Sequence, residues 1–168
     1  MRSPTAAWKM ALLAAVLVAG CGVDQISKRA VADNLEVGER VEVAEGFLDI
    51  RHARNEHAAF GMLDVLRPAI RRPVLIAFQL GGFALAAILV VAWRQSRVAD
   101  LVPYVLIAAG AAGNVLDRIL LGGVVDFIFV HYRDSFSWPV FNVADVLITL
   151  GVGLLLLNSL RAKLPKTP

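Results

Sequence analysis

The chain has only one cysteine, Cys21, among its 168 residues. One cysteine cannot form an intrachain disulfide, and it cannot supply the thiolates of a cysteine-based zinc site. Charged residues are also scarce, at 18% of the sequence, against about 25% in a typical soluble domain. Hydrophobic residues reach 58% and the mean hydropathy is +0.66, so the chain has too much apolar surface to remain disordered in water. This composition predicts an integral membrane protein.

The net charge of +3 does not indicate a nucleic-acid partner. Basic residues are spread along the chain and mostly flank hydrophobic runs, as is typical of residues at the two faces of a membrane. A nucleic-acid-binding protein would gather them into one patch.

Four hydrophobic runs predict membrane-spanning helices, because a span needs roughly 20 mostly apolar residues. The first run, Trp8–Val23, reaches that length if the helix continues to Lys28. The second is expected to begin at Pro73, whose missing N–H suits the first turn of a helix. The expected spans are residues 8–28, 74–93, 101–121 and 141–160. We therefore expect a single domain with the fold class of an all-α polytopic membrane protein.

Residues 32–72 form a polar insert between the first two spans. Within it, Val41–Val43 alternates in polarity, and Phe47–Ile50 follows a break at Gly46. These patterns predict short strands, which would make a small extracytoplasmic β-sheet. Ala58–Leu66 is predicted to form a short interfacial helix.

An even number of spans places both termini on one side of the membrane. That side would carry only one acidic residue, Asp100, beside the basic residues Arg2, Lys9, Arg94, Arg97, Arg161, Lys163 and Lys166. Excess Lys and Arg near span ends is typical of the cytoplasmic side. The opposite side has more basic residues in total, including Arg71 and Arg72, so the charge rule supports cytoplasmic termini without proving them.

Polar residues gather at one end of the predicted spans. Consecutive spans run in opposite directions, so the end of the first span, the end of the third and the start of the fourth share the outer face. The residues concerned are Asp24, Lys28, Asn114, Asp117, Arg118, Asp126, Asn142 and Asp145. Ionisable residues inside spans cost roughly 2.5–3.5 kcal/mol each on insertion scales, and they usually mark function or mutual pairing.

Each residue also has a purely structural interpretation. Asp24 and Lys28 are four residues apart and could form a simple ion pair. Asn114 could bridge two helices. Asn142 could cap the fourth span, with Asp145 favoured by the positive end of the helix dipole.

Taken together, the residues suggest a catalytic pair. Asp126 and Asp145 come from separate elements and can face each other at the membrane boundary. Two such carboxyl groups share one proton, because they cannot both ionise easily. The ionised member can take a proton from water while the protonated member polarises a peptide carbonyl. Arg118, Asn114 and Asn142 could then position the substrate or the pair.

The sequence resembles the lipoprotein signal peptidases, also called signal peptidase II, over nearly its whole length. The matching segments, in order, are Asp24–Lys28, Arg54-Asn55 followed by Ala58–Gly61, Gly110–Arg118, Val124–Phe127 and Phe141–Asp145. The resemblance implies an intramembrane aspartic endopeptidase of the bacterial inner membrane. Such enzymes remove the signal peptide from diacylglyceryl-modified prolipoproteins by cutting before the lipidated cysteine.

The resemblance also assigns roles to residues. Asp126 and Asp145 match the catalytic pair, at the periplasmic face. Residues matching those that bind substrate or support the site are Asp24, Lys28, Asn55, Asn114, Arg118 and Asn142. The resemblance implies no metal ion and no organic cofactor. The expected partners are prolipoprotein substrates, membrane lipid and globomycin-type inhibitors, without nucleic acid, and we expect a monomer.

One position departs from the family pattern. His57 stands where the family usually has glycine, two residues after Asn55. Glycine permits backbone angles that a bulkier residue resists, so this loop is expected to differ in shape. His57 is interpreted as a solvated loop residue, the alternative being a group that titrates near neutral pH.

Two other functions remain open from the sequence. Val18–Cys21 resembles the lipobox of a lipoprotein, although Gly20 and Cys21 also suit a simple role in packing the first span. A small ion transporter would likewise use intramembrane Asp and Arg residues. Against transport, Gln79 is the only polar residue between Val74 and Leu89 apart from glycines, so no polar track crosses the bilayer.

Overall fold

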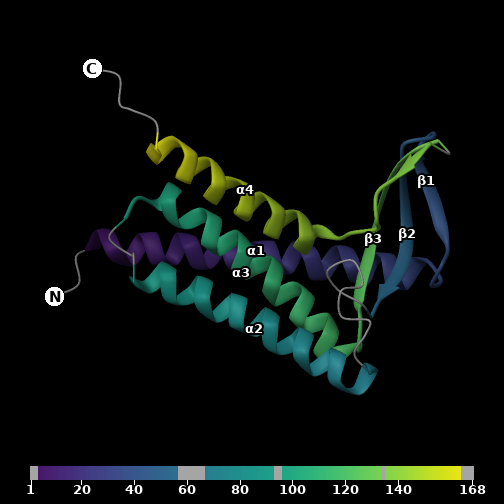
Figure 1. Ribbon diagram of the computed structural model, residues 1–168, viewed down its shortest axis with the longest axis horizontal. Coiled ribbons are helices and arrows are strands. Elements are labelled where there is room, and N and C mark those ends of the chain that lie inside the picture. The colour runs from purple at the N-terminus through teal and green to yellow at the C-terminus, as the bar shows by residue number, and fades with distance from the viewer. Residues whose placement is uncertain (1–3, 57–66, 93–95, 134, 164–168) are drawn as a thin grey trace.

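The computed structural model describes residues 4–56, 67–92, 96–133 and 135–163. Within this part of the chain, four helices are long and apolar enough to cross a membrane, which confirms the predicted fold class. They run side by side, with both chain ends at one end of the bundle and a small sheet at the other (Figure 1). The helices are α1 (Pro4–Asn34), α2 (Pro68–Ala92), α3 (Val98–Leu120) and α4 (Val143–Lys163).

Helix α3 is the centre of the bundle. It packs against each of the other three helices, and 56% of its most apolar stretch is buried, compared with 11% for α1 and for α4. The outer helices therefore turn most of their apolar surface toward the space that lipid occupies in a membrane. This arrangement explains why the polar residues of α3 can reach partners on every side.

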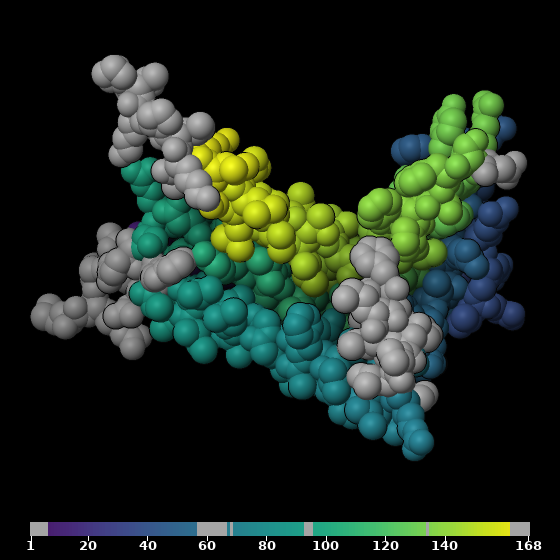
Figure 2. Space-filling model, viewed as in Figure 1, coloured from purple at the N-terminus to yellow at the C-terminus, as the bar shows by residue number. Residues whose placement is uncertain are grey.

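In the described part of the chain, the sheet has four antiparallel strands in the order β1-β2-β3-β4. Strands β1 (Arg40–Ala44) and β2 (Leu48–Asn55) form a hairpin, at the place where the sequence predicts short strands within the insert. Strands β3 (Val124–Tyr132) and β4 (Phe136–Ser137) were not predicted. The sheet stands at the end of the bundle, and the molecular surface is hollowed between it and α4 (Figure 2).

Helices α1 and α2 differ most in extent from the prediction, whereas α3 and α4 differ by three residues or fewer at each end. Helix α1 continues past Lys28 to Asn34, and α2 begins at Pro68, so Pro73 lies inside the helix and not in its first turn. The hydropathy pattern missed the first turns of α2 because Arg71 and Arg72 interrupt it. Pro68 itself has no N–H to leave unpaired at the helix start. The predicted helix over Ala58–Leu66 lies outside the described residues.

Glycines allow α1, α3 and α4 to pack closely. A Cβ atom at Gly110 would overlap the backbone carbonyl of Ala144, and one at Gly113 would overlap the Asp24 carboxylate. Small residues at a helix interface let backbones approach closely in membranes. The close approach places the start of α4 directly against α1 and α3.

We predict that Gly110→Ala lowers the free energy of unfolding by about 1–3 kcal/mol, because the added methyl group meets a rigid backbone carbonyl. Gly82→Ala is the matched control, since a Cβ atom there has no neighbour within 4 Å and alanine favours a helix. Thermal unfolding of the purified protein in detergent measures both effects. Equal unfolding temperatures for the two variants would contradict the close packing of α3 on α4.

Candidate functional site

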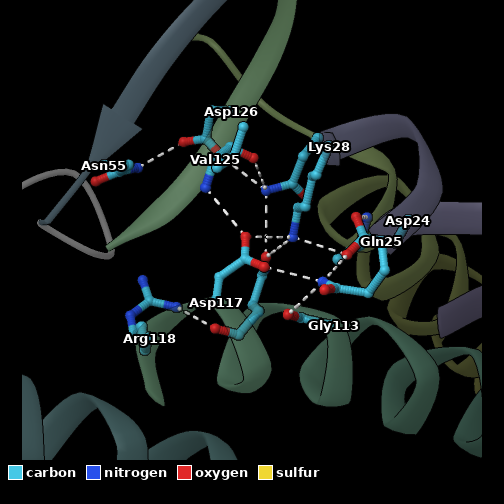
Figure 3. Close-up of polar contacts among 12 residues, drawn as sticks. Asp24, Gln25, Lys28, Asn55, Gly113, Asp117, Arg118, Val125 and Asp126 are labelled. Carbon is cyan, nitrogen blue, oxygen red and sulfur yellow. Dashed lines mark hydrogen bonds and ion pairs between the residues drawn. The ribbon is translucent and has the colours of Figure 1, made fainter. Parts of the chain in front are cut away.

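The polar residues that the sequence placed at one face meet where the sheet joins the bundle (Figure 3). They come from α1, α3, β3 and the start of α4, Asn55 joins them from β2, and most are buried. The buried members are Asp24, Lys28, Asn114, Asp117, Arg118, Asp126 and Asn142. The structure thus brings together side chains that are up to 121 positions apart, as in the pair Asp24 and Asp145.

Lys28 is the central cation of the cluster. Its Nζ lies 2.7 Å from Asp24 Oδ2 and 3.1 Å from Asp117 Oδ2, and it donates a hydrogen bond of 2.9 Å to Asn114 Oδ1. An ammonium group has three N–H donors, and each of these oxygens can accept one. The expected ion pair between Asp24 and Lys28 is therefore present, as part of a larger network.

The two carboxylates beside Lys28 also hold backbone. Asp24 Oδ1 accepts the N–H of Ala144 at 2.8 Å, and Asp117 Oδ2 accepts the N–H of Val125 at 3.0 Å. Ala144 directly precedes Asp145 in the chain, and Val125 directly precedes Asp126. The network around Lys28 therefore positions the backbone next to both of these aspartates.

Asp117 and Gln25 were not among the predicted site residues. Gln25 Nε2 donates to Asp117 Oδ1 at 2.9 Å and to the carbonyl of Gly113 at 3.2 Å. The sequence suggests only that Asp117 and Arg118 are neighbours that pair elsewhere. Asp117 pairs with Lys28, which is on another helix. The sequence offered one signal of this pairing, because Arg118 alone could not balance all the acidic residues gathered at that face.

Asn142 links Asp126 to Asp145. Its side-chain Nδ2 donates to Asp126 Oδ1 at 2.6 Å, while its backbone N–H donates to Asp145 Oδ2 at 3.3 Å. Its Oδ1 accepts the N–H of Asp145 at 3.0 Å, which is the reciprocal pattern of a helix capping box. The capping interpretation is therefore correct, and the same cap holds a carboxylate toward Asp126.

Strand β3 brings Asp126 to this cap. The N–H of Ile128 donates to the carbonyl of Phe141 at 2.7 Å, and the N–H of Phe141 donates back to Ile128 at 3.1 Å. This bridge fixes the residue before Asn142 against the strand that carries Asp126. The unpredicted strand is thus the element that closes the site.

Two further asparagines bind the carboxylates. Asn55 Nδ2 donates to Asp126 Oδ2 at 2.8 Å, and Asn114 Nδ2 donates to Asp145 Oδ1 at 2.9 Å. The pKa of Asp126 is raised to about 6, mainly by burial; the hydrogen bond from Asn55 opposes this rise, and the charge of Asp145 adds to it. Two carboxyl groups that are joined through one asparagine, Asn142, in a largely buried site are suited to sharing one proton.

Arg118 contacts the edge of the site. Its Nη1 donates to Gln79 Oε1 on α2 at 3.0 Å, so the one amide in the apolar run of α2 pairs with it. His57 lies outside the described residues. Within the described part of the chain, no group of three or more His, Cys, Asp and Glu residues is arranged to hold a metal ion.

Comparison with known proteins points to one group. A family model described as signal peptidase (SPase) II matches residues 15–161. A lipoprotein signal peptidase of Solibacter usitatus is 38% identical over 162 residues, covering 95% of each chain. One from Geobacter metallireducens is 39% identical over 139 residues, covering 83% of this chain and 84% of the relative. A solved structure described as a bacterial membrane enzyme superposes with a TM-score of 0.80 at 29% identity, covering 94% of each chain.

We predict that Lys28→Met destabilises the protein by about 3–5 kcal/mol, because it leaves the buried carboxylates of Asp24 and Asp117 without their cation. Arg29→Met is the matched control, since it removes one positive charge from the exposed side of the same helix. Thermal unfolding in detergent measures the difference. A Lys28→Met protein as stable as the Arg29→Met protein would show that the network does not hold the fold together.

Proposed function

The chain belongs to the signal peptidase II family, and we propose that it removes signal peptides from diacylglyceryl-modified prolipoproteins through an aspartic mechanism. The observation that carries the proposal is the joint attachment of Asp126 and Asp145 to Asn142. The family match supports the reaction, and the geometry supports Asp126 and Asp145 as the pair that performs it. We place Asp24, Lys28, Asn55, Asn114, Arg118 and Asn142 in supporting roles.

In this mechanism Asp145 is the ionised member of the pair. It lies in the first turn of α4, where the helix dipole favours negative charge, and it accepts hydrogen bonds from Asn114 and from the Asn142 backbone. Its carboxylate takes a proton from water as the water oxygen attacks the scissile carbonyl carbon. General-base catalysis of this kind contributes about 10²–10⁴-fold to a rate.

Asp126 is the member that carries the proton. Its carboxyl donates to the carbonyl oxygen as the tetrahedral intermediate forms. When the C–N bond breaks, the leaving nitrogen receives the proton that Asp145 took from water. As the new carbonyl forms, a hydroxyl group of the intermediate returns its proton to Asp126. The products are a carboxylic acid on the signal peptide, which then releases its proton to water, and a free amino group on the lipidated cysteine.

The position of the site suits this substrate. The site lies at the end of the bundle next to the sheet, and both chain ends lie at the opposite end (Figure 1). Cytoplasmic termini therefore give a periplasmic site, at the depth where a lipidated cysteine meets the membrane surface. The sheet would hold the peptide from above while its lipid chains remain between helices.

The family match favours peptidase activity over the alternatives of a lipoprotein and a transporter. Helix α1 also continues without a break through Cys21 to the network residues Asp24 and Lys28. Removing the segment before Cys21 would take away most of the first span. We further propose that the enzyme acts as a monomer, is blocked by globomycin and needs no metal ion.

We predict that Asp126→Asn and Asp145→Asn each lower cleavage of a diacylglyceryl-modified prolipoprotein at least about 100-fold. The measurement is the rate of signal-peptide release by purified enzyme, with globomycin added as a control. Asp100→Asn is the matched variant, because Asp100 opens α3 at the opposite end of the bundle, and it should retain the wild-type rate.

An active Asp126→Asn or Asp145→Asn enzyme would overturn the two-carboxylate mechanism. Cleavage that is abolished by a chelator would overturn the proposal that no metal ion takes part. Intact-mass analysis that finds Cys21 at a processed N-terminus would support the lipoprotein interpretation instead.

We predict that cleavage slows as the pH rises above about 6. The pKa of Asp126 is raised to about 6 by burial, so its carboxyl keeps the required proton below that pH and loses it above. The profile of kcat/KM against pH in the free enzyme reports this ionisation, with apparent values that belong to the pair. A flat profile between about pH 5 and 8 would exclude a protonated carboxyl as the acid.

A further inference from the structure

A groove of about 860 Å³ lies beside the site, between the start of α2, the end of β2 and the end of α3. Its polar lining comes from Arg54, Arg71, Arg72 and Glu56, and Ile76 and Leu80 contribute to its apolar lining. The volume is in the range of sites that hold small organic molecules. No residue of the proposed aspartate pair lines it.

Two guanidinium groups converge at one point of the groove. Gly122 has a φ of +85°, and a Cβ atom built on it would lie 3.4 Å from Arg54 Nη2 and 3.5 Å from Arg72 Nη1. The two guanidinium groups therefore lie on either side of one position beside Gly122. The two arginines come from β2 and α2, so the fold brings these like charges together. Like charges at short range repel, and an anion placed between them relieves that repulsion.

Among the residues that the structure describes, the contacts of these arginines leave their positive charge largely uncompensated. Arg72 donates to the carbonyls of Arg118 and Ile119 at 3.0 and 3.1 Å, and Arg54 donates to the carbonyl of Leu121. These acceptors are neutral. The acidic residue in the lining, Glu56, lies 4.0 Å from Arg54 Nε with both side chains about half exposed, where an ion pair contributes little.

The dipole of α2 adds to the positive potential. The groove lies against the first turns of this helix, and no acidic residue within its N-terminal turn offsets the positive end of the dipole. Ile76 and Leu80 continue the lining along α2 into the membrane-spanning part of the helix. The groove therefore pairs a cationic end, at the edge of the span, with an apolar wall inside it.

We propose that this groove binds an anionic phospholipid, with the phosphodiester between Arg54 and Arg72 and an acyl chain along Ile76 and Leu80. Guanidinium groups bind phosphate oxygens through paired hydrogen bonds. The level of the groove, at the end of a span, is the level of lipid headgroups. A free phosphate ion would use the arginines and leave the apolar wall without a ligand.

The test uses the full-length protein, purified in an uncharged detergent. Dioleoyl phosphatidylglycerol, dioleoyl phosphatidylcholine and inorganic phosphate are added separately at equal concentration. Native mass spectrometry counts bound lipid, and thermal unfolding reports stabilisation. We expect several-fold more bound phosphatidylglycerol than phosphatidylcholine, and a rise in Tm of about 3 °C with phosphatidylglycerol alone.

Variants locate the binding. Arg54→Gln and Arg72→Gln should each remove the preference for phosphatidylglycerol, whereas Arg97→Gln should keep it. Arg97 is the matched control because it is exposed at the opposite end of the bundle, before α3. If Arg72→Gln fails to fold because it releases the end of α3, Arg54→Gln and the lipid preference of the wild type decide the question.

Three outcomes would overturn the proposal. Equal binding of the two lipids would remove the role of charge, and equal stabilisation by inorganic phosphate would reduce the groove to a simple anion site. A preference that survives both Arg54→Gln and Arg72→Gln would place the lipid elsewhere. None of these readouts involves peptide cleavage, so failure here leaves the proposed peptidase mechanism untouched.

Discussion

The burial of the Lys28 ammonium between Asp24 and Asp117 is the interaction on which the rest of the structure depends. A lysine inside a membrane protein is costly unless its charge and its three donors are satisfied, and here Asp24, Asp117 and Asn114 satisfy them. The two carboxylates then reach the N–H groups of Ala144 and Val125. One buried cation therefore ties α1 to α3, α4 and β3.

The same network sets the electrostatics of the proposed active site. Because Lys28 is occupied by Asp24 and Asp117, the second pair of carboxyl groups has mainly neutral amides for partners: Asn55, Asn114 and Asn142. Amides orient a carboxyl group without supplying a full positive charge. Burial can then raise the pKa of Asp126 to about 6, which a directly paired lysine would oppose. The two aspartates that are paired with Lys28 thus hold in place the two aspartates whose partners are mainly neutral amides.

Structural roles and proposed functional roles coincide at several residues. Asn142 caps α4 and, through the same side chain, connects Asp126 to Asp145. Arg72 binds the last carbonyls of α3 and also lines the cationic groove. In each case the free backbone groups at a helix end need a partner in a region with little water. The residues that satisfy them are therefore well placed to bind substrate or lipid.

The sequence by itself determined the membrane class, the four spans, the short strands in the insert and the gathering of polar residues at one face. These features follow from local hydropathy and from the alternation of span direction, which need no knowledge of contacts. Only the tertiary structure decided that Asp117 pairs with Lys28, that β3 carries Asp126 against the cap of α4, and that α2 starts at Pro68.

Strand β3 was missed because Val124–Val130 is almost continuously apolar, a pattern that does not distinguish a buried strand from a helix end. The sequence did not determine which charged groups pair, because a buried charge pairs with whichever group the packing of the helices brings near. That packing, at Gly110 and Gly113, acts between segments far apart in the chain.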